Sequence, residues 1–318
     1  MLPRAADVIA AGHRLRSRVV RTPLVHSPAL SARTGVRVFL KCENLQRTGS
    51  FKLRGATNAL LALDDDARRL GVVASSAGNH GLGLADAARA LGVRARIFVP
   101  STAPEVKRNG IAALGAELDV TAPHYDAAHD AAVAYASAHG MTFVNPCAGR
   151  ALLAGQGTVA LEILEELPTL RTILVPVGGG GLVGGVAALL RAASPMVRII
   201  GVQSAATNAM AASFAAGRRV DVATPPTLAD GLTGQIDDEG FAIGRLAIDE
   251  MVVVSEPEVA SAVAWLAREH DLRVEGSGAV VVAALRASSL ASLEGEVAAV
   301  LSGGNIDEGR WREIVASA

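Results

Sequence analysis

Short apolar runs rich in Val and Ile alternate with longer stretches rich in Ala and Leu along most of this chain. The short runs have the length of buried strands, and the longer stretches have the period of amphipathic helices. Such alternation is typical of parallel sheets with helices on both faces. Only 3% of the residues are aromatic, which suits buried aliphatic strands packed against Ala-rich helices. We therefore predict an α/β fold. The predicted strands are residues 36–42, 71–76, 95–100, 116–121, 141–145, 171–177, 197–203, 250–255 and 296–302.

The order of these strands indicates two lobes. Four strand–helix units follow one another closely between residues 72 and 145, which is enough for a small sheet. We expect residues 1–70 and 146–318 to form a large domain and residues 71–145 to form a small one. No repeat, low-complexity tract or Pro/Gly linker separates the two.

The clearest helix is predicted for residues 256–270. Ser255 and Glu258 have the three-residue spacing of a capping box, directly before the apolar positions Val259, Val263 and Leu266. This pattern marks the beginning of the helix.

Charge and cysteine content exclude several classes of partner. The formal net charge is −1 with no long run of one sign, so the sequence gives no indication of nucleic-acid or anionic-membrane binding. Cys42 and Cys147 lie far apart without a CxxC motif or a cysteine-histidine cluster, which argues against a disulfide framework or a structural zinc. The N-terminal region lacks the features of a signal peptide, and no apolar run reaches the roughly 18 residues of a membrane span. We expect a cytoplasmic protein with a small-molecule partner.

The first candidate site is the segment PVGGGGLVGG at residues 176–185. Ligands bind at the carboxyl ends of the strands in sheets of this kind, and this loop leaves a predicted strand and enters a helix. Gly178, Gly179, Gly180 and Gly181 carry no side chain that would keep an anion from their N–H groups, and the helix dipole adds to the attraction. We interpret the loop as a phosphate site; a flexible strand-to-helix turn is the alternative.

Gly179, Gly181 and Gly184 also match the dinucleotide motif GxGxxG. That motif requires an acidic residue at the end of the next strand, where it holds a ribose hydroxyl. Here the next predicted strand ends in Gln203, so a nicotinamide cofactor is disfavoured.

Two further loops follow predicted strands. In SSAGNHG, residues 75–81, small residues expose N–H groups suited to a carboxylate, and Asn79 can offer its amide to a phenolic or carbonyl oxygen. An ordinary helix cap is equally consistent with this loop. In LSGGNID, residues 301–307, the hydroxyl of Ser302 is placed to meet a ring nitrogen, although a simple Gly-Asn turn fits as well.

The fourth segment is RTGSFKLRG at residues 47–55. Gly49 and Ser50 precede a predicted helix, so Lys52 lies in the first turn, at the unfavourable positive end of the helix dipole. Such a lysine is either a solvated surface residue or a nucleophile that forms a Schiff base with a carbonyl. Together the four loops suit a ligand with a phosphate, an aldehyde, a phenolic oxygen and a ring nitrogen. Pyridoxal 5′-phosphate (PLP) has all four groups.

The stretches KCENLQRTGSFKLRGA, SSAGNHG, AGQGT, PVGGGGL and LSGGN stand in the order found in fold-type II PLP enzymes, those similar to the tryptophan synthase β-subunit. The chain resembles the serine/threonine dehydratase and serine racemase family from about residue 15 to residue 307. The resemblance implies two lobes, each with a mainly parallel twisted sheet flanked by helices, with the active site in the cleft between them. The large domain would bind PLP, and the small domain would move to close over the substrate.

The resemblance also implies roles for individual residues. Lys52 would hold the cofactor as a Schiff base, with Phe51 against the face of the cofactor ring. Asn79 would bind the ring's 3′ oxygen and Ser302 the pyridine nitrogen. The phosphate would be wrapped by Gly178, Gly179, Gly180, Gly181 and Leu182, and the substrate carboxylate would be bound by the backbone of Ser76, Gly78, Asn79 and His80.

The activity implied is β-elimination of water from a small β-hydroxy amino acid such as L-threonine or L-serine, giving a 2-keto acid and ammonia. Alternative substrates in the family are 3-hydroxyaspartate, phenylserine and intermediates of hydroxyectoine breakdown. A β-replacement enzyme of the cysteine-synthase kind is disfavoured because the lysine motif and the Ser-Ala-Gly-Asn loop differ from those of that group. A non-catalytic member is disfavoured by the presence of Lys52. Family members are commonly homodimers or homotetramers.

Three departures from the family pattern refine this prediction. Racemases have a second proton-handling serine where this chain has Ala77, so racemisation is expected to be minor. The racemase metal site aligns with Gln203 and Ala209, so no metal is expected. Arg150, beside the expected substrate pocket, would either reach an acidic substrate or lie on the surface; we favour the surface. The chain ends at Ala318, soon after the last motif, and feedback by isoleucine is not expected.

Overall fold

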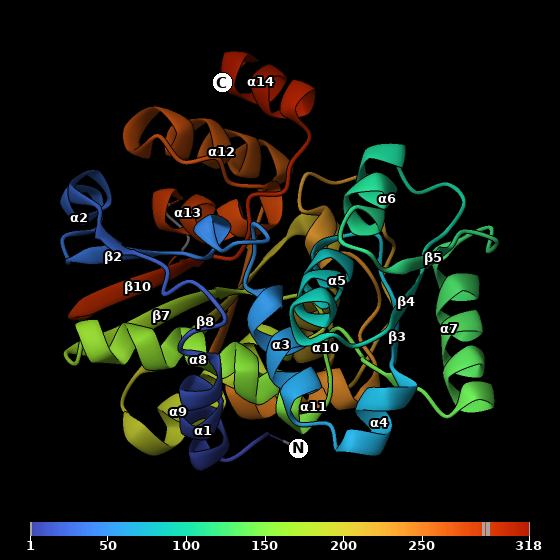
Figure 1. The fold of residues 1–318 in the computed structure, drawn as a ribbon. Helices are drawn as coiled ribbons and strands as arrows, with labels where there is room; N and C mark the ends of the chain where they lie inside the picture. Colours follow the sequence, from blue (N-terminus) through green and yellow to red (C-terminus); the bar gives the residue numbers. More distant parts are fainter. Residues whose placement is uncertain (1, 288–289, 291–292, 318) are drawn as a thin grey trace.

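The structure is a computed structural model that describes residues 2–287, 290 and 293–317. Two sheets form its framework (Figure 1). The larger sheet has six strands in the order β1-β2-β10-β7-β8-β9, and the smaller has four in the order β5-β4-β3-β6. Every neighbouring pair is parallel except β1 and β2. The strands of the larger sheet are β1 (Leu24–His26), β2 (Val38–Cys42), β7 (Leu170–Pro176), β8 (Arg198–Ser204), β9 (Glu250–Val254) and β10 (Glu296–Leu301), and those of the smaller sheet are β3 (Val72–Ser75), β4 (Ala95–Phe98), β5 (Glu117–Asp119) and β6 (Thr142–Phe143).

All nine predicted strands are confirmed, although most are shorter than predicted. The strand β1 was not predicted, because three residues are too few to show a period. It pairs antiparallel with β2 at the edge of the larger sheet, with Val25 opposite Leu40.

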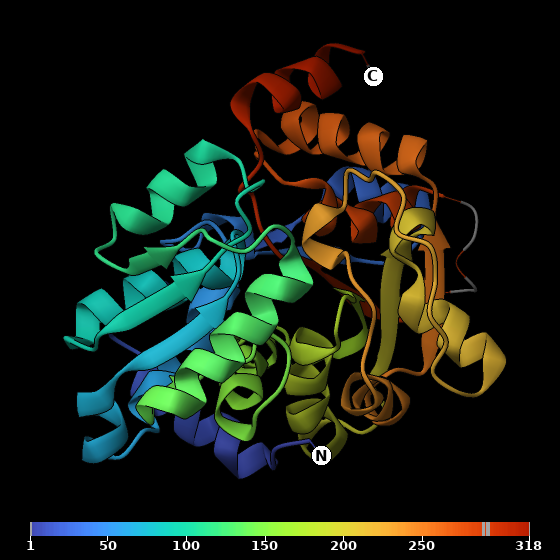
Figure 2. The ribbon, with the colours of Figure 1, turned by 90° about the vertical axis from the view of Figure 1, so that its right-hand side faces the viewer.

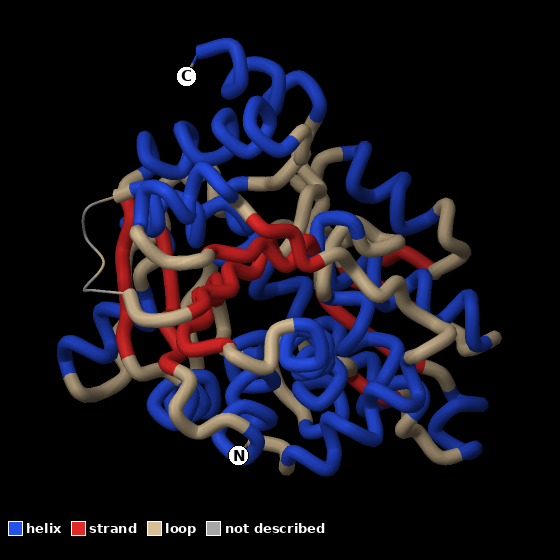
Figure 3. Tube along the Cα trace, turned by 90° about the vertical axis from the view of Figure 1, so that its left-hand side faces the viewer, coloured by secondary structure: helices blue, strands red, loops and turns tan. Residues whose placement is uncertain are grey.

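Helices cover both faces of the larger sheet (Figures 1 and 3). The helices are α1 (Ala5–Leu15), α2 (Pro28–Thr34), α3 (Lys52–Leu61), α4 (Asp65–Leu70), α5 (Asn79–Leu91), α6 (Glu105–Ala112), α7 (Tyr125–His139), α8 (Arg150–Glu166), α9 (Gly181–Ala193), α10 (Ala209–Ala216), α11 (Asp238–Ala247), α12 (Glu256–His270), α13 (Gly276–Arg286) and α14 (Glu308–Ser317), with the short 3-10 turns η1 (Glu43–Leu45), η2 (Ala205–Thr207) and η3 (Asp230–Leu232). The capping box predicted for α12 is confirmed: the Ser255 hydroxyl accepts from the Glu258 N–H, and the Glu258 carboxylate accepts from the Ser255 N–H at 2.7 Å.

The larger sheet separates two hydrophobic cores, and β10 contributes to both. Ala298 and Val300 pack in the core that includes residues of α8 and α9, whereas Val297, Ala299 and Leu301 pack in the core that includes residues of α12 and α13. Successive side chains of a strand point to opposite faces, so a strand buried on both sides is apolar throughout. This explains why the parallel strands read as continuous apolar runs in the sequence.

Helix α3 lies between the two sheets and packs against α5 and α8 (Figures 1 and 2). Leu53, Ala56 and Leu60 of α3 share a buried cluster with Val72 of the smaller sheet and Leu152 of α8. The helix that begins at Lys52 is therefore fixed at the junction of the two sheets. The predicted division into a large and a small domain remains a prediction. No helix within the described residues is long and apolar enough to cross a bilayer.

Candidate active site

Lys52 is the first residue of α3, as predicted, and its side chain is partly buried. Its Nζ donates a hydrogen bond to the Pro146 carbonyl at 2.8 Å and lies 5.2 Å from the centroid of the Phe51 ring. Within the described part of the chain, no carboxylate forms an ion pair with Lys52. The amine is held by a neutral carbonyl, which lets it exchange partners.

The segment Pro146–Cys147 brings Lys52 close to the glycine loop. A Cβ atom at Gly179 would lie 2.7 Å from the Cys147 Sγ, and one at Gly181 would lie 3.0 Å from the Cys147 Cα. Side chains at these two positions would collide with the segment that accepts the Lys52 hydrogen bond. Gly180 has a φ of 92°, a left-handed conformation that glycine adopts without strain. The loop is thus a tight turn that contacts the Lys52 environment.

The glycine loop presents unused N–H groups. Among the described residues, no oxygen accepts a hydrogen bond from the N–H of Gly178, Gly179 or Gly180. Helix α9 begins at Gly181, so its first N–H groups also have no acceptor within the helix. These groups and the helix dipole fit a phosphate, and they lie beside an amine suited to an aldehyde. The residues present therefore fit PLP.

Ser302 follows β10 and lies beside the lysine segment. The Phe51 N–H donates to the Ser302 carbonyl at 3.1 Å, and Ser50 forms an isolated antiparallel bridge with Gly303. The Ser302 hydroxyl is buried, and its one hydrogen bond to a described residue is a long one, 3.5 Å, to the Ser277 carbonyl. Ser302, Phe51 and Lys52 are thus brought together as predicted, while the pyridine-binding role of Ser302 remains a prediction.

Asn79 links the loop after β3 to the loop after β10. Its Nδ2 donates to the Glu275 Oε1 at 2.8 Å, and its Oδ1 accepts from the Asn305 Nδ2 at 2.7 Å. Both ends of the amide are therefore fixed in one orientation.

Glu275 is a site residue that the sequence reasoning missed. It precedes α13 and is 4% exposed. Burial raises the pKa of this carboxyl to about 7, the charge of Asp230 acts in the same direction, and the hydrogen bond from Asn79 opposes both. A single acidic residue between Val274 and the small residues of α13 was the only sequence signal. The carboxyl titrates near neutral pH, in contact with the amide predicted to hold the cofactor's 3′ oxygen.

The remaining predicted substrate residues lie at the beginning of α5. The Ser76 N–H donates to the Phe98 carbonyl at 3.2 Å and the Gly78 N–H to the Ser76 hydroxyl at 3.2 Å. The N–H groups of Asn79 and His80, in the first turn of α5, have no acceptor within the helix. The Asn79 and His80 N–H groups are therefore better placed to bind a carboxylate than those of Ser76 and Gly78, which already have acceptors.

His80 is buried, and its imidazole is neutral. Its Nε2 lies 2.9 Å from the Val144 carbonyl, so this nitrogen carries the proton and donates it. Burial, and then the charge of Lys52, lower the pKa of His80 to about 3. A neutral ring keeps a second positive charge away from Lys52.

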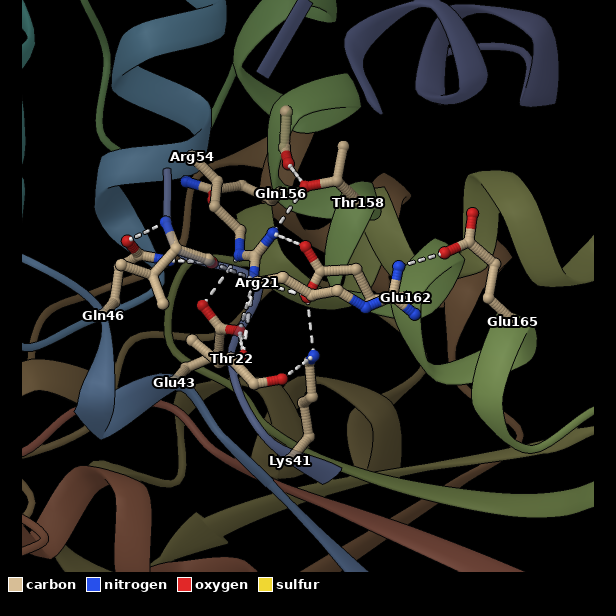
Figure 4. Close-up of polar contacts among 12 residues, drawn as sticks. Arg21, Thr22, Lys41, Glu43, Gln46, Arg54, Gln156, Thr158, Glu162 and Glu165 are labelled. Carbon is tan, nitrogen blue, oxygen red and sulfur yellow. Dashed lines mark hydrogen bonds and ion pairs between the residues drawn. The ribbon is translucent and has the colours of Figure 1, made fainter. Parts of the chain in front are cut away.

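A network of paired charges lies on the other side of α3 (Figure 4). Arg54 is fully buried and donates to Glu43 at 2.8 Å and to Glu162 at 2.7 Å. Lys41, also fully buried, donates to Glu162 at 2.6 Å. Although burial acts to raise it, hydrogen bonds and charges of Arg54 and Lys41 hold the pKa of Glu162 below its ordinary value. The network fixes the first turns of α3 to β2, η1 and α8.

The segment AGQGT, residues 154–158 of α8, adds further contacts between α8 and α3. The Gln156 Oε1 accepts from the Gly55 N–H at 3.1 Å, so it caps one N–H group of the first turn of α3. A Cβ atom at Gly155 would lie 2.6 Å from the Arg54 carbonyl. The motif therefore allows α8 to approach the lysine-bearing helix closely.

Arg150 and Gln203, two further residues considered in the sequence analysis, both have partners within the protein. Arg150 is exposed and pairs with Asp7 of α1 at 2.8 Å, so the surface alternative is confirmed. Gln203 donates to the Val177 carbonyl at 3.0 Å and accepts from the Ala211 N–H at 2.9 Å, so both ends of its amide are used. The described residues contain no group of three His, Cys, Asp or Glu side chains placed to hold a metal.

The chain belongs to the pyridoxal-phosphate dependent enzyme family, whose family model matches residues 15–303. This match confirms the predicted cofactor and the predicted fold type.

Among proteins of known name, the chain is similar to threonine ammonia-lyases and to a serine racemase. The chain is 44% identical over 298 residues to L-threonine ammonia-lyase of Geobacter sulfurreducens. The match covers 93% of this chain and 74% of that protein. It is 37% identical to the catabolic L-threonine dehydratase TdcB of Escherichia coli, over 97% of this chain and 94% of that one. The structure of maize serine racemase matches with a TM-score of 0.94 at 31% identity, covering 100% of this chain and 98% of that chain.

Proposed function

We propose that this protein is a PLP-dependent ammonia-lyase that removes the hydroxyl group of L-threonine or L-serine and releases a 2-keto acid and ammonia. The observation that carries the proposal is the placement of Lys52 at the junction of the two sheets, beside a glycine loop with free N–H groups. Similarity to L-threonine ammonia-lyases over more than nine-tenths of the chain supports the substrate class.

The same residues that the sequence singled out would hold the cofactor. Lys52 would hold the cofactor through its aldehyde, and the N–H groups of Gly178 to Leu182 would hold its phosphate. Phe51, which lies beside Lys52, would pack against the ring, Asn79 would hold the 3′ oxygen, and Ser302 would meet the pyridine nitrogen. When bound, PLP supplies a conjugated ring that accepts the electron pair released at the substrate Cα.

Lys52 then acts as the general base. Once its amine is free, it removes the α proton of the substrate, and the Pro146 carbonyl keeps it oriented. The substrate carboxylate binds the N–H groups of Asn79 and His80 at the beginning of α5, where the helix dipole favours an anion. Residues 71–145 move as a small domain to close over the bound substrate.

Two residue choices favour elimination over racemisation. Ser302 is a neutral partner for the pyridine nitrogen, which weakens the cofactor as an electron sink and favours loss of the β-hydroxyl. Ala77 provides no acid on the face opposite Lys52, so reprotonation from that side is slow. The enzyme acts in the cytoplasm as a homodimer or homotetramer, without metal.

The test is a panel of β-hydroxy amino acids with ammonia release as the readout, including L-threonine, L-serine, 3-hydroxyaspartate and phenylserine. We expect threonine or serine to give the highest kcat/KM. D-serine is measured in the same reactions, and a rate of racemisation equal to that of elimination would contradict the assignment.

A further inference from the structure

The buried ring of His80 has one nitrogen that the fold does not use. His80 is 2% exposed in the first turn of α5, and its Nε2–H donates to the Val144 carbonyl at 2.9 Å. Because the ring is neutral, the lone pair of its Nδ1 is a hydrogen-bond acceptor. Within the described residues, no donor is bonded to this Nδ1. Leaving a buried acceptor without a donor is costly, so the stability of the fold does not explain this nitrogen.

The Lys52 amine lies close to this ring. A Cβ atom at Gly83, almost one turn after His80, would lie 3.1 Å from the Lys52 carbonyl carbon, so α5 touches the backbone of the lysine residue. The carbonyls of Val144 and Pro146, two residues apart, accept from the ring and from the amine respectively. After burial, the charge of Lys52 is the main influence that lowers the pKa of His80. The ring and the amine are therefore neighbours at the junction of α3 and α5.

A base needs its lone pair in a fixed direction. A neutral primary amine has two N–H donors and one lone pair, so two fixed acceptors leave a single direction for the lone pair. In the structure the Lys52 amine donates to the Pro146 carbonyl and to no other described residue. The amine can still rotate about this one hydrogen bond. A second acceptor without charge would stop the rotation, whereas a carboxylate would favour the protonated amine, which is not a base.

We propose that His80 is a positioning residue for the base: its Nδ1 accepts the second N–H of the freed Lys52 amine and directs the lone pair at the substrate's α proton. This inference rests on the proposed function. His80 belongs to residues 71–145 and Lys52 does not, so the proposed closure brings the ring to the amine. The bond to Val144 lies within the moving part and keeps the ring oriented. The α proton goes to the Lys52 Nζ, and the electron pair of the broken C–H bond stays with the substrate and its cofactor.

Two substitutions separate this role from a purely structural one. His80→Gln places an amide N–H near the position of Nε2 and keeps the bond to Val144, but it has no acceptor at the position of Nδ1. His80→Asn places an amide oxygen near the position of Nδ1 but is too short to reach Val144. The control is His13→Gln, at an exposed histidine of α1. All are compared with wild type as holoenzyme, using the better substrate of L-threonine and L-serine.

His80→Gln should lower kcat about tenfold, as expected for the loss of one hydrogen bond to a reacting amine, and should leave KM little changed. The isotope effect on kcat with substrate deuterated at Cα should rise in this variant, because proton removal becomes slower relative to the other steps. His80→Asn should keep more of kcat than His80→Gln but melt at a lower temperature, because it loses the bond to Val144. The control His13→Gln should match wild type in every measurement. A purely structural role predicts the reverse order of kcat for the two His80 variants.

Nitrogen NMR of wild-type holoenzyme with labelled histidine tests the acceptor without turnover. The Nδ1 signal of His80, assigned by its loss in His80→Gln, should show no bound proton at neutral pH. The proposal is overturned if this Nδ1 carries the proton, if His80→Gln keeps the wild-type kcat, or if His80→Asn loses as much kcat as His80→Gln. Failure of the proposed function would show differently, as no ammonia release by wild type from any β-hydroxy amino acid of the panel.

Discussion

Polar groups on one side of α3 are paired within the protein, whereas those on the other side are left without strong partners. On the side of β2 and α8, the buried charges of Arg54, Lys41 and Glu43 are all paired, with each other or with the partly buried Glu162 (Figure 4). On the side of the glycine loop, the Pro146 carbonyl is the only hydrogen-bond partner of the Lys52 amine among the described residues, and the N–H groups of Gly178, Gly179 and Gly180 have no acceptor there. One side of the helix start is fixed in the folded protein, and the other is left open for a cofactor. The comparison predicts that changes on the first side reduce stability, whereas changes on the second side reduce activity.

The largest effect is expected for Lys52→Ala. Loss of the base alone should reduce kcat/KM for L-threonine by about 10²- to 10⁴-fold, and loss of the covalent link to the cofactor should add to this. Stability towards urea should change little, because the Lys52 side chain forms no ion pair with the described residues. The measurements are ammonia release and mass spectrometry for borohydride-fixed cofactor. Retention of fixed cofactor in the variant would show that another residue carries it.

Arg54→Met should mainly affect stability. It leaves the buried Glu43 without its ion-pair partner, and removing one member of a buried ion pair costs about 3–5 kcal/mol. The free energy of unfolding measured with urea should fall by this amount, while the surface control Arg312→Gln should change little. If Arg54→Met were as stable as wild type, the claim that this charge network stabilises the folded protein would be wrong.

Glu275→Gln should change the pH dependence of both stability and activity. The pKa of Glu275 is raised from 4.5 to about 7 in the folded protein, so between these values the unfolded chain loses this proton more readily. The carboxyl therefore favours the unfolded state increasingly as pH rises through this range, by at most about 3 kcal/mol. The variant should lack this loss of stability.

For the same variant, an inflection in the pH profile of kcat/KM near pH 7 should disappear, because Glu275 contacts the amide of Asn79. Urea unfolding at several pH values and a full pH–rate profile provide the data. An unchanged pH profile of kcat/KM would show that Glu275 does not act on the candidate active site.

Gly179→Ala should give the smallest effect. The added Cβ would lie 2.7 Å from the Cys147 Sγ and would displace the segment that orients Lys52. Overpacking of this kind costs about 1–3 kcal/mol, and we expect it as a loss of cofactor affinity of roughly tenfold. The matched control is Gly110→Ala, where the nearest atom to the new Cβ is 3.4 Å away. Equal cofactor affinity in the two variants would argue against a tight glycine loop.

The sequence was sufficient where local patterns determine structure. The nine strands and the cap of α12 depend on short-range periodicity and on a three-residue spacing, both visible in a single chain. The glycine loop and the Asn79 loop were singled out because they follow predicted strands, and Lys52 because it lies at the unfavourable positive end of a helix dipole. The roles of these residues came from the resemblance and remain predictions. The short strand β1 was missed because it has no period of its own.

The burial of individual charged side chains in the folded protein could not be predicted from the sequence. Lys41 and Glu162 are separated by 121 residues, and their charges look like ordinary surface charges until the fold buries them together. Glu275 likewise gains its raised pKa from burial and from Asp230, a residue of another segment. Such groups are recognised only when the elements that enclose them are placed in space.

The position of β10 has a consequence for how the chain is made. This strand lies between β2 and β7 in the larger sheet, although it is the last strand in the order of synthesis. The smaller sheet is complete once residue 143 has left the ribosome, but β2 waits for a central neighbour until residues 296–301 emerge. Exposed strand edges favour aggregation during such delays. Nascent chains of this protein should therefore depend on chaperone protection late in translation.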